Sequence, residues 1–161
     1  MKVLVAGVGN RLQGDDGFGV AVSQLLSDKP LGADVTVREF GIGGIHLVQE
    51  LFEGYDALLL IDAVDRGSPA GTLHLLEPQV PELDSLPAEQ RRDFLADVHW
   101  ADPARALILA RALGVLPARV LVLGCQPSTL DDLSLDLSPL VEARLPEALR
   151  MIKRAVRELA A

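Results

Sequence analysis

The sequence predicts an α/β fold, in which a largely parallel sheet carries helices on both of its faces. Strand-like and helix-like apolar patterns alternate along its 161 residues. The apolar run 57–61 is continuous, as in central strands that are buried on both faces. A glycine-rich turn follows the first apolar run, which is where open α/β sheets place their sites. No repeat or linker divides the chain, so we expect a single domain over residues 1–161.

Each element is predicted from its local pattern. Apolar or alternating runs predict five strands, at residues 3–8, 34–40, 57–61, 72–76 and 120–124. Periodic apolar residues predict helices at residues 18–26, 45–52 and 102–113, whereas residues 77–88 are expected to form a loop. Ser138 and Pro139 begin a last helix that should reach about residue 159 and kink at Pro146. The connector 66–71 is shorter than the dozen or so residues that a parallel crossover needs, so strand 72–76 should run antiparallel.

Composition excludes several classes of protein. A formal net charge of −8 argues against a nucleic-acid partner, because affinity for nucleic acid comes mainly from neutralising phosphates. No apolar stretch reaches the roughly 20 residues that a membrane span needs, and no signal peptide precedes the first strand. The single cysteine, Cys125, forms no internal disulfide and follows an apolar strand, which favours a small buried side chain over a nucleophile. We therefore expect a soluble, cytoplasmic protein with no membrane partner.

The turn after the first strand carries two adjacent carboxylates, Asp15 and Asp16. Its glycines fall at positions 7, 9 and 14, which is not the spacing of a dinucleotide-binding turn. Two carboxylates would repel a phosphate and attract a cation. Adjacent residues point in different directions, and we expect Asp16 to be the one that faces the site. The neighbouring Asn10 is expected to fix the turn, with donation to an oxyanion as the alternative.

Three polar side chains are predicted to converge in one site: Asp16, Asp62 and His99. Asp16 follows the first strand and Asp62 ends the third, and these two strands should be neighbours at the switch point of the sheet. His99 precedes the helix at 102–113 and can reach the same cleft. Two carboxylates and an imidazole suit Ni²⁺ or Zn²⁺ better than Ca²⁺ or Cu⁺. The alternative roles are a turn residue for Asp62, a helix-start carboxylate for Asp16 and a partly buried surface histidine for His99.

Four features together resemble the hydrogenase maturation endopeptidases. They are the glycine-rich motif from Gly7 to Gly19, the segments Ile61–Val64 and Pro69–Thr72, and a late histidine before a helix. The resemblance covers residues 1 to about 150. It implies a three-layer α/β/α sandwich with a twisted, five-stranded, mostly parallel sheet in which one strand is antiparallel.

The resemblance also implies an activity. Members of the family remove the C-terminal extension of the large-subunit precursor of a [NiFe] hydrogenase after nickel has been inserted. Their metal-contacting positions match Asp16, Asp62 and His99, which would serve both as ligands and as catalytic residues. The nickel would be supplied by the substrate, and other divalent metals such as zinc or cadmium would fit the same ligands. The expected partner is this precursor, and the protein itself is expected to be a monomer.

Two other functions remain open from the sequence alone. The first is a nickel-binding chaperone or checkpoint that grips the large subunit without cutting it. The second is a peptidase of related fold that acts on another substrate, since a fold does not fix a function.

Where many members carry a threonine after the second strand, this chain has Ile42, so substrate choice is expected to differ.

Overall fold

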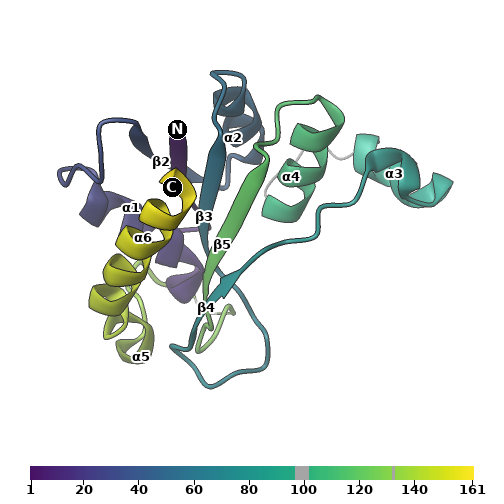
Figure 1. Ribbon diagram of the computed structural model, residues 1–161. Coiled ribbons are helices and arrows are strands. Elements are labelled where there is room, and N and C mark those ends of the chain that lie inside the picture. Colours follow the sequence, from purple (N-terminus) through teal and green to yellow (C-terminus); the bar gives the residue numbers. More distant parts are fainter. Residues whose placement is uncertain (97–101, 132) are drawn as a thin grey trace.

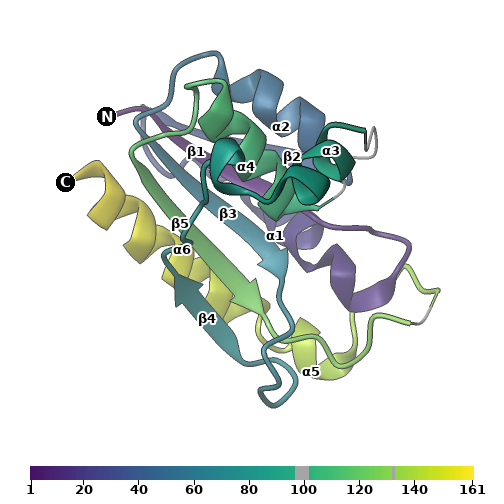
Figure 2. The ribbon, with the colours of Figure 1, turned by 90° about the vertical axis from the view of Figure 1, so that its right-hand side faces the viewer.

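The computed structural model describes residues 1–96, 102–131 and 133–161. Five strands form one sheet: β1 Val3–Val8, β2 Val35–Gly41, β3 Ala57–Ala63, β4 Leu73–Leu76 and β5 Arg119–Cys125. Their spatial order is β2-β1-β3-β5-β4. Neighbours pair in parallel except β4, which runs antiparallel to β5 (Figure 2). The predicted fold class and the single antiparallel strand are confirmed.

Helices cover both faces of this sheet. They are α1 Phe18–Leu26, α2 Gly44–Leu51, α3 Ala88–Ala96, α4 Pro103–Ala112, α5 Pro139–Glu142 and α6 Leu145–Ala160, with 3₁₀ turns η1 Gly14–Gly17 and η2 Leu83–Ser85. Helices α1 and α6 lie on one face, and α2 and α4 lie on the other (Figure 1). Alternate residues of a strand point to opposite faces, so Val3 and Val5 pack with α1 and α6 while Leu4 and Ala6 pack with α2 and α4. No described helix is both long enough and apolar enough to cross a bilayer.

The last helix differs from the prediction. The sequence predicts one helix kinked at Pro146, but the chain forms two helices, α5 and α6, with a turn at residues 143–144. Pro146 lies in the first turn of α6, where its missing N–H needs no partner. Continuing one helix through this proline would lose a hydrogen bond and bring its ring against the preceding turn, so the chain restarts instead.

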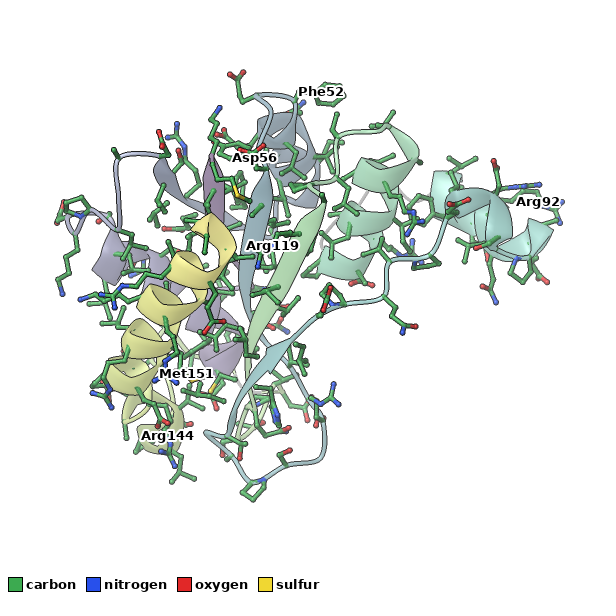
Figure 3. All side chains as sticks on the ribbon, in the orientation of Figure 1. Phe52, Asp56, Arg92, Arg119, Arg144 and Met151 are labelled. Atoms are coloured by element: carbon green, nitrogen blue, oxygen red, sulfur yellow. The ribbon has the colours of Figure 1, made fainter. Side chains whose placement is uncertain are left out.

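Two short elements have no counterpart in the prediction. The stretch predicted as loop contains η2, and α3 begins at its last residue. Helix α3 is polar on nearly every side, with Phe94 as its one buried residue, so its sequence lacks the apolar periodicity that predicts a helix. It lies apart from the sheet, and its Arg92 extends away from the rest of the molecule (Figure 3).

Cys125 is fully buried at the end of β5. Burial raises the pKa of its thiol to about 12, and the negative charge of Asp15 acts in the same direction. The thiol therefore stays protonated and packs as a small apolar group, as predicted.

Candidate functional site

The glycine-rich turn after β1 is shaped by close backbone contacts. Gly9 has a φ of 130°, and a Cβ placed on it would lie 1.9 Å from the carbonyl oxygen of Asp16. A Cβ on Gly19 would lie 2.3 Å from the carbonyl oxygen of Val8 and 2.1 Å from that of Ile61. The start of α1 is thus pressed against the ends of β1 and β3, and only glycine allows this approach. As a result, Asp16 is held where these two strands end.

The two adjacent aspartates of this turn have different surroundings. The carboxylate of Asp15 is 2% exposed and accepts hydrogen bonds from Ser128 N at 2.8 Å, Ser138 N at 2.7 Å and Ser138 Oγ at 2.8 Å. The carboxylate of Asp16 is partly exposed, and within the described part of the chain its Oδ2 accepts one hydrogen bond, from Asn10 N at 2.7 Å. Asp15 therefore ties the turn to the segment after β5, and Asp16 keeps free acceptor capacity.

Asp62 lies next to the last residue of β3, on the strand adjacent to β1. Its Oδ1 accepts a hydrogen bond from Ala63 N at 2.8 Å and would lie 3.7 Å from a Cβ on Gly9. Gly9 also lies against the backbone carbonyl of Asp16, and the charge of Asp16 contributes to the pKa of Asp62, so the two residues are neighbours at the switch point of the sheet.

Burial and charge change the pKa of Asp62. Burial is the larger cause and the negative charge of Asp16 the next, and together with Asp102 they raise this pKa to about 8 against the effect of the Ala63 N–H. Near neutral pH the pair therefore holds a proton or needs a positive charge. Such a pair fits a divalent cation, whose charge would replace the proton.

The third predicted ligand, His99, lies outside the described residues. At the start of α4, Asp102 Oδ1 accepts a hydrogen bond from Ala104 N at 2.9 Å and caps the helix. Over residues 1–96, 102–131 and 133–161, no cluster of three histidine, cysteine or acidic side chains is arranged to hold a metal. The triad therefore stays a prediction, and its two carboxylates are the part that the described structure brings together.

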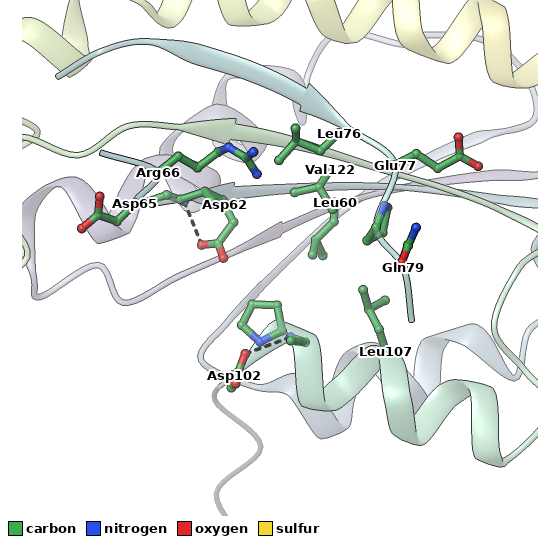
Figure 4. Close-up of a pocket in the computed structure, with 15 residues that line it drawn as sticks. Leu60, Asp62, Asp65, Arg66, Leu76, Glu77, Gln79, Asp102, Leu107 and Val122 are labelled. Atoms are coloured by element: carbon green, nitrogen blue, oxygen red, sulfur yellow. Dashed lines mark hydrogen bonds between the residues drawn. The ribbon is translucent and has the colours of Figure 1, made fainter. Parts of the chain in front are cut away.

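A cavity of about 650 Å³ opens beside Asp62, between β3 and the start of α4 (Figure 4). Asp62 and Leu60 point into it from β3, and Leu107 faces them from α4. Asp102 lies at the mouth on the same side as α4. The first turn of α4 and the end of β3 thus form two walls of one cleft.

Sequence reasoning missed one residue that shapes this cleft, Gln126. Its side chain is 5% exposed, and its Oε1 accepts hydrogen bonds from Arg66 N at 2.7 Å and Ser68 N at 3.2 Å. Its Nε2 donates to Asp65 Oδ1 at 2.9 Å, which is the main reason that the pKa of Asp65 is lowered. Gln126 therefore holds the loop after β3 in place. The only signal in the sequence is a polar residue directly after an apolar strand.

Asn10 has the structural role that the sequence favoured. Its Oδ1 accepts a hydrogen bond from Leu12 N at 3.0 Å, and its Nδ2 donates to Gln13 Oε1 at 3.3 Å. Both contacts stay within the turn, so the side chain fixes the local backbone.

Comparisons with known proteins agree with this architecture. A family model described as hydrogenase maturation protease matches residues 20–155. The chain is 36% identical over 152 residues to the hydrogenase expression/formation protein HupD of Thiocapsa roseopersicina, which covers 93% of this chain and 65% of the relative. It is 35% identical over 161 residues to HupD of Rhodobacter capsulatus, with 99% and 72% covered.

Solved structures give the same result. The hydrogenase maturating endopeptidase HybD from E. coli superposes with a TM-score of 0.76 at 28% identity, covering 98% of this chain and 93% of that one. The hydrogenase 2 maturation peptidase from Thaumarchaeota archaeon SCGC_AB-539-E09 superposes with a TM-score of 0.69 at 36% identity, covering 97% and 98%. The likeness extends over nearly the whole of each chain.

Proposed function

Because this chain belongs to the hydrogenase maturation protease family, we propose that it removes the C-terminal extension of a [NiFe] hydrogenase large-subunit precursor after nickel insertion. In this proposal the nickel arrives with the precursor and is gripped by Asp16, Asp62 and His99. The observation that carries the proposal is the pair of carboxylates Asp16 and Asp62: burial of Asp62, and next the negative charge of Asp16, raise the pKa of Asp62 to about 8. A site with this excess of negative charge is completed by a cation that its partner brings.

The chain's own side chains would act by binding and orienting. Asp16 is held by the Asn10 N–H and Asp62 by the Ala63 N–H, so each carboxylate keeps one oxygen free of these bonds. A divalent ion held by these residues would supply a positive charge that polarises a carbonyl or activates a water. Asp62 would release its proton to solvent when the ion of the precursor binds, and the carboxylates of Asp16 and Asp62 would then hold the adjacent peptide of the precursor beside the cleft. An alignment error of about 1 Å would already cost on the order of 10²-fold in rate.

The test uses nickel-loaded and nickel-free precursor, incubated with the purified protein and read by intact mass. Loss of the C-terminal extension only from the nickel-loaded form is the expected result. Binding without any loss of mass would instead show a non-cleaving chaperone. Cleavage of both forms at equal rates would show a peptidase that does not depend on nickel.

A second measurement tests the origin of the metal. The isolated protein should hold divalent metal weakly, because a shell of three protein ligands with open positions is meant to be completed by the substrate. Elemental analysis after dialysis against a chelator should therefore find little nickel or zinc. A stoichiometric amount of either metal would contradict delivery by the substrate.

A further inference from the structure

The cavity beside Asp62 has an apolar interior that two metal-binding carboxylates do not require. Leu60 and Leu107 face each other across it and are only 2% and 4% exposed, and Val122 of β5 lies beside them (Figure 4). Leu60 precedes Asp62 by two residues in β3, so both side chains point to the same face of the sheet. The apolar wall therefore begins directly beside the carboxylate.

The size of the cavity fits a bound group. Its volume of about 650 Å³ lies within the roughly 300–1,000 Å³ that is usual for ligand sites. The walls come from β3, β5 and α4, which are regular elements packed into the core of the α2 and α4 face. A ligand that enters this space would bury the apolar surface that half-buried lining residues still expose, which favours binding; these residues are Val64, Leu76, Pro103 and Val122.

The rim of the cavity limits what can enter. Three exposed carboxylates lie on it, Asp65, Glu77 and Asp102, with Arg66 as a single cation among the described residues that line it. The Gln126 side chain holds the loop that carries Asp65 and Arg66. The rim would thus repel an acidic segment and accept an apolar segment that is neutral or basic.

We propose that this cavity is a specificity subsite that takes an apolar side chain of the precursor, from a residue within about three positions of the cleaved bond. The proposal rests on the proposed function, in which the bond lies beside Asp62. An extended chain advances about 3.3 Å per residue and alternates its side chains, so a chain aligned at Asp62 places a nearby side chain in the cavity that Leu60 and Leu107 line.

Ala104 offers a way to fill the subsite without disturbing the core. It lies in the first turn of α4, lines the cavity and is exposed. Ala104→Trp would place a large side chain at the mouth. Ala112→Trp is the matched control, because Ala112 is exposed at the other end of the same helix and does not line the cavity.

The experiment compares kcat/KM on nickel-loaded precursor for the wild type and both variants, with cleavage followed by intact mass. Ala104→Trp should lose at least about tenfold, and Ala112→Trp should stay within about twofold of the wild type. A panel of precursors, each with one of the three residues on either side of the bond changed to Gly or Asp, then locates the occupant. At one position, wild-type cleavage should fall most with Asp, and Gly should remove the disadvantage of Ala104→Trp.

Several results would overturn the subsite. Equal rates for Ala104→Trp and Ala112→Trp on every precursor would do so, as would an Asp scan with no sensitive position. Circular dichroism and thermal melting check that both variants fold, and Ala104→Leu replaces Ala104→Trp if the latter does not. If the wild type leaves its nickel-loaded precursor intact, the proposed function fails. In that case, precursor affinity for the same variants tests the subsite, and equal affinities would reject it.

Discussion

The carboxylate of Asp15 and the carboxylate pair of Asp16 and Asp62 differ in how their negative charge is compensated. Asp15 is 2% exposed and is compensated by three donors from Ser128 and Ser138. Asp16 and Asp62 each accept a hydrogen bond from a backbone N–H, and burial together with the charge of Asp16 raises the pKa of Asp62 to about 8. The first arrangement is complete within the fold, whereas in the second no cation of the described residues lowers the pKa of Asp62. The difference separates a carboxylate that holds the structure from carboxylates that are available to a ligand.

The largest expected effect comes from removing one negative charge from the pair Asp16 and Asp62. Asp16→Asn or Asp62→Asn should leave the fold intact and reduce processing by about 10²-fold or more, because each change removes a ligand charge and keeps the shape. Intact mass of the nickel-loaded precursor measures the loss. Asp28→Asn, the same substitution at an exposed position after α1, is the matched control. Normal cleavage by either site variant would remove that carboxylate from the mechanism.

The next largest effect is expected from substitution of His99, the third predicted ligand. His99→Ala should retain the fold, bind nickel-loaded precursor more weakly and reduce cleavage by about 10²-fold, because one of three ligands also sets the orientation of the bond. Precursor binding and intact mass are measured on the same samples. Near-normal cleavage by this variant would reject the triad and leave Asp16 and Asp62 as the only predicted ligands.

The raised pKa of Asp62 predicts that the metal affinity of Asp16 and Asp62 depends on pH. Below pH 8 a divalent ion must displace the Asp62 proton, so the affinity for Ni²⁺ or Zn²⁺ should fall by about tenfold per pH unit from pH 8 to pH 6. Calorimetry in buffers of different ionisation enthalpy should detect close to one proton released per ion at pH 7. An affinity that does not change over this range would contradict the prediction.

The raised pKa of Asp62 also makes the stability of the fold depend on pH. The folded-state pKa lies above the unfolded value of 3.8, so the metal-free fold loses stability as the pH rises from about 4 to 8. Asp62→Asn removes this loss. The variant should therefore gain stability relative to the wild type across that window, as measured by denaturant unfolding at several pH values. An unchanged difference between the two proteins would show that Asp62 has an ordinary pKa.

Substitution of Asp15, whose carboxylate accepts three hydrogen bonds, should have the smallest effect on processing and the clearest effect on stability. Asp15→Ala leaves the buried donors from Ser128 and Ser138 without their acceptor, which should cost about 3 kcal/mol of unfolding free energy. Asp15→Asn keeps one acceptor oxygen, so it should cost less and leave cleavage within a few-fold of the wild type below its melting temperature. A loss of cleavage in Asp15→Asn as large as that in Asp16→Asn would show that Asp15 faces the metal instead.

Local patterns in the sequence determined most of the architecture. The continuous apolar run at Ala57–Ile61 identified a central strand, and the short connector before β4 predicted its antiparallel direction, since neither depends on distant residues. The placement of Asp16 and Asp62 after neighbouring strands could also be predicted, because parallel strands end at one edge of the sheet.

Other features were decided only by tertiary structure, because they depend on residues far apart in the chain. The different roles of Asp15 and Asp16 follow from Ser128 and Ser138, more than a hundred residues away, and no local pattern distinguishes two adjacent aspartates. Gln126 holds the loop after β3 through contacts across about 60 residues. The sequence alone thus predicted the five strands, most of the helices and the placement of Asp16 and Asp62 at one edge of the sheet, and packing decided which of these side chains are already hydrogen-bonded.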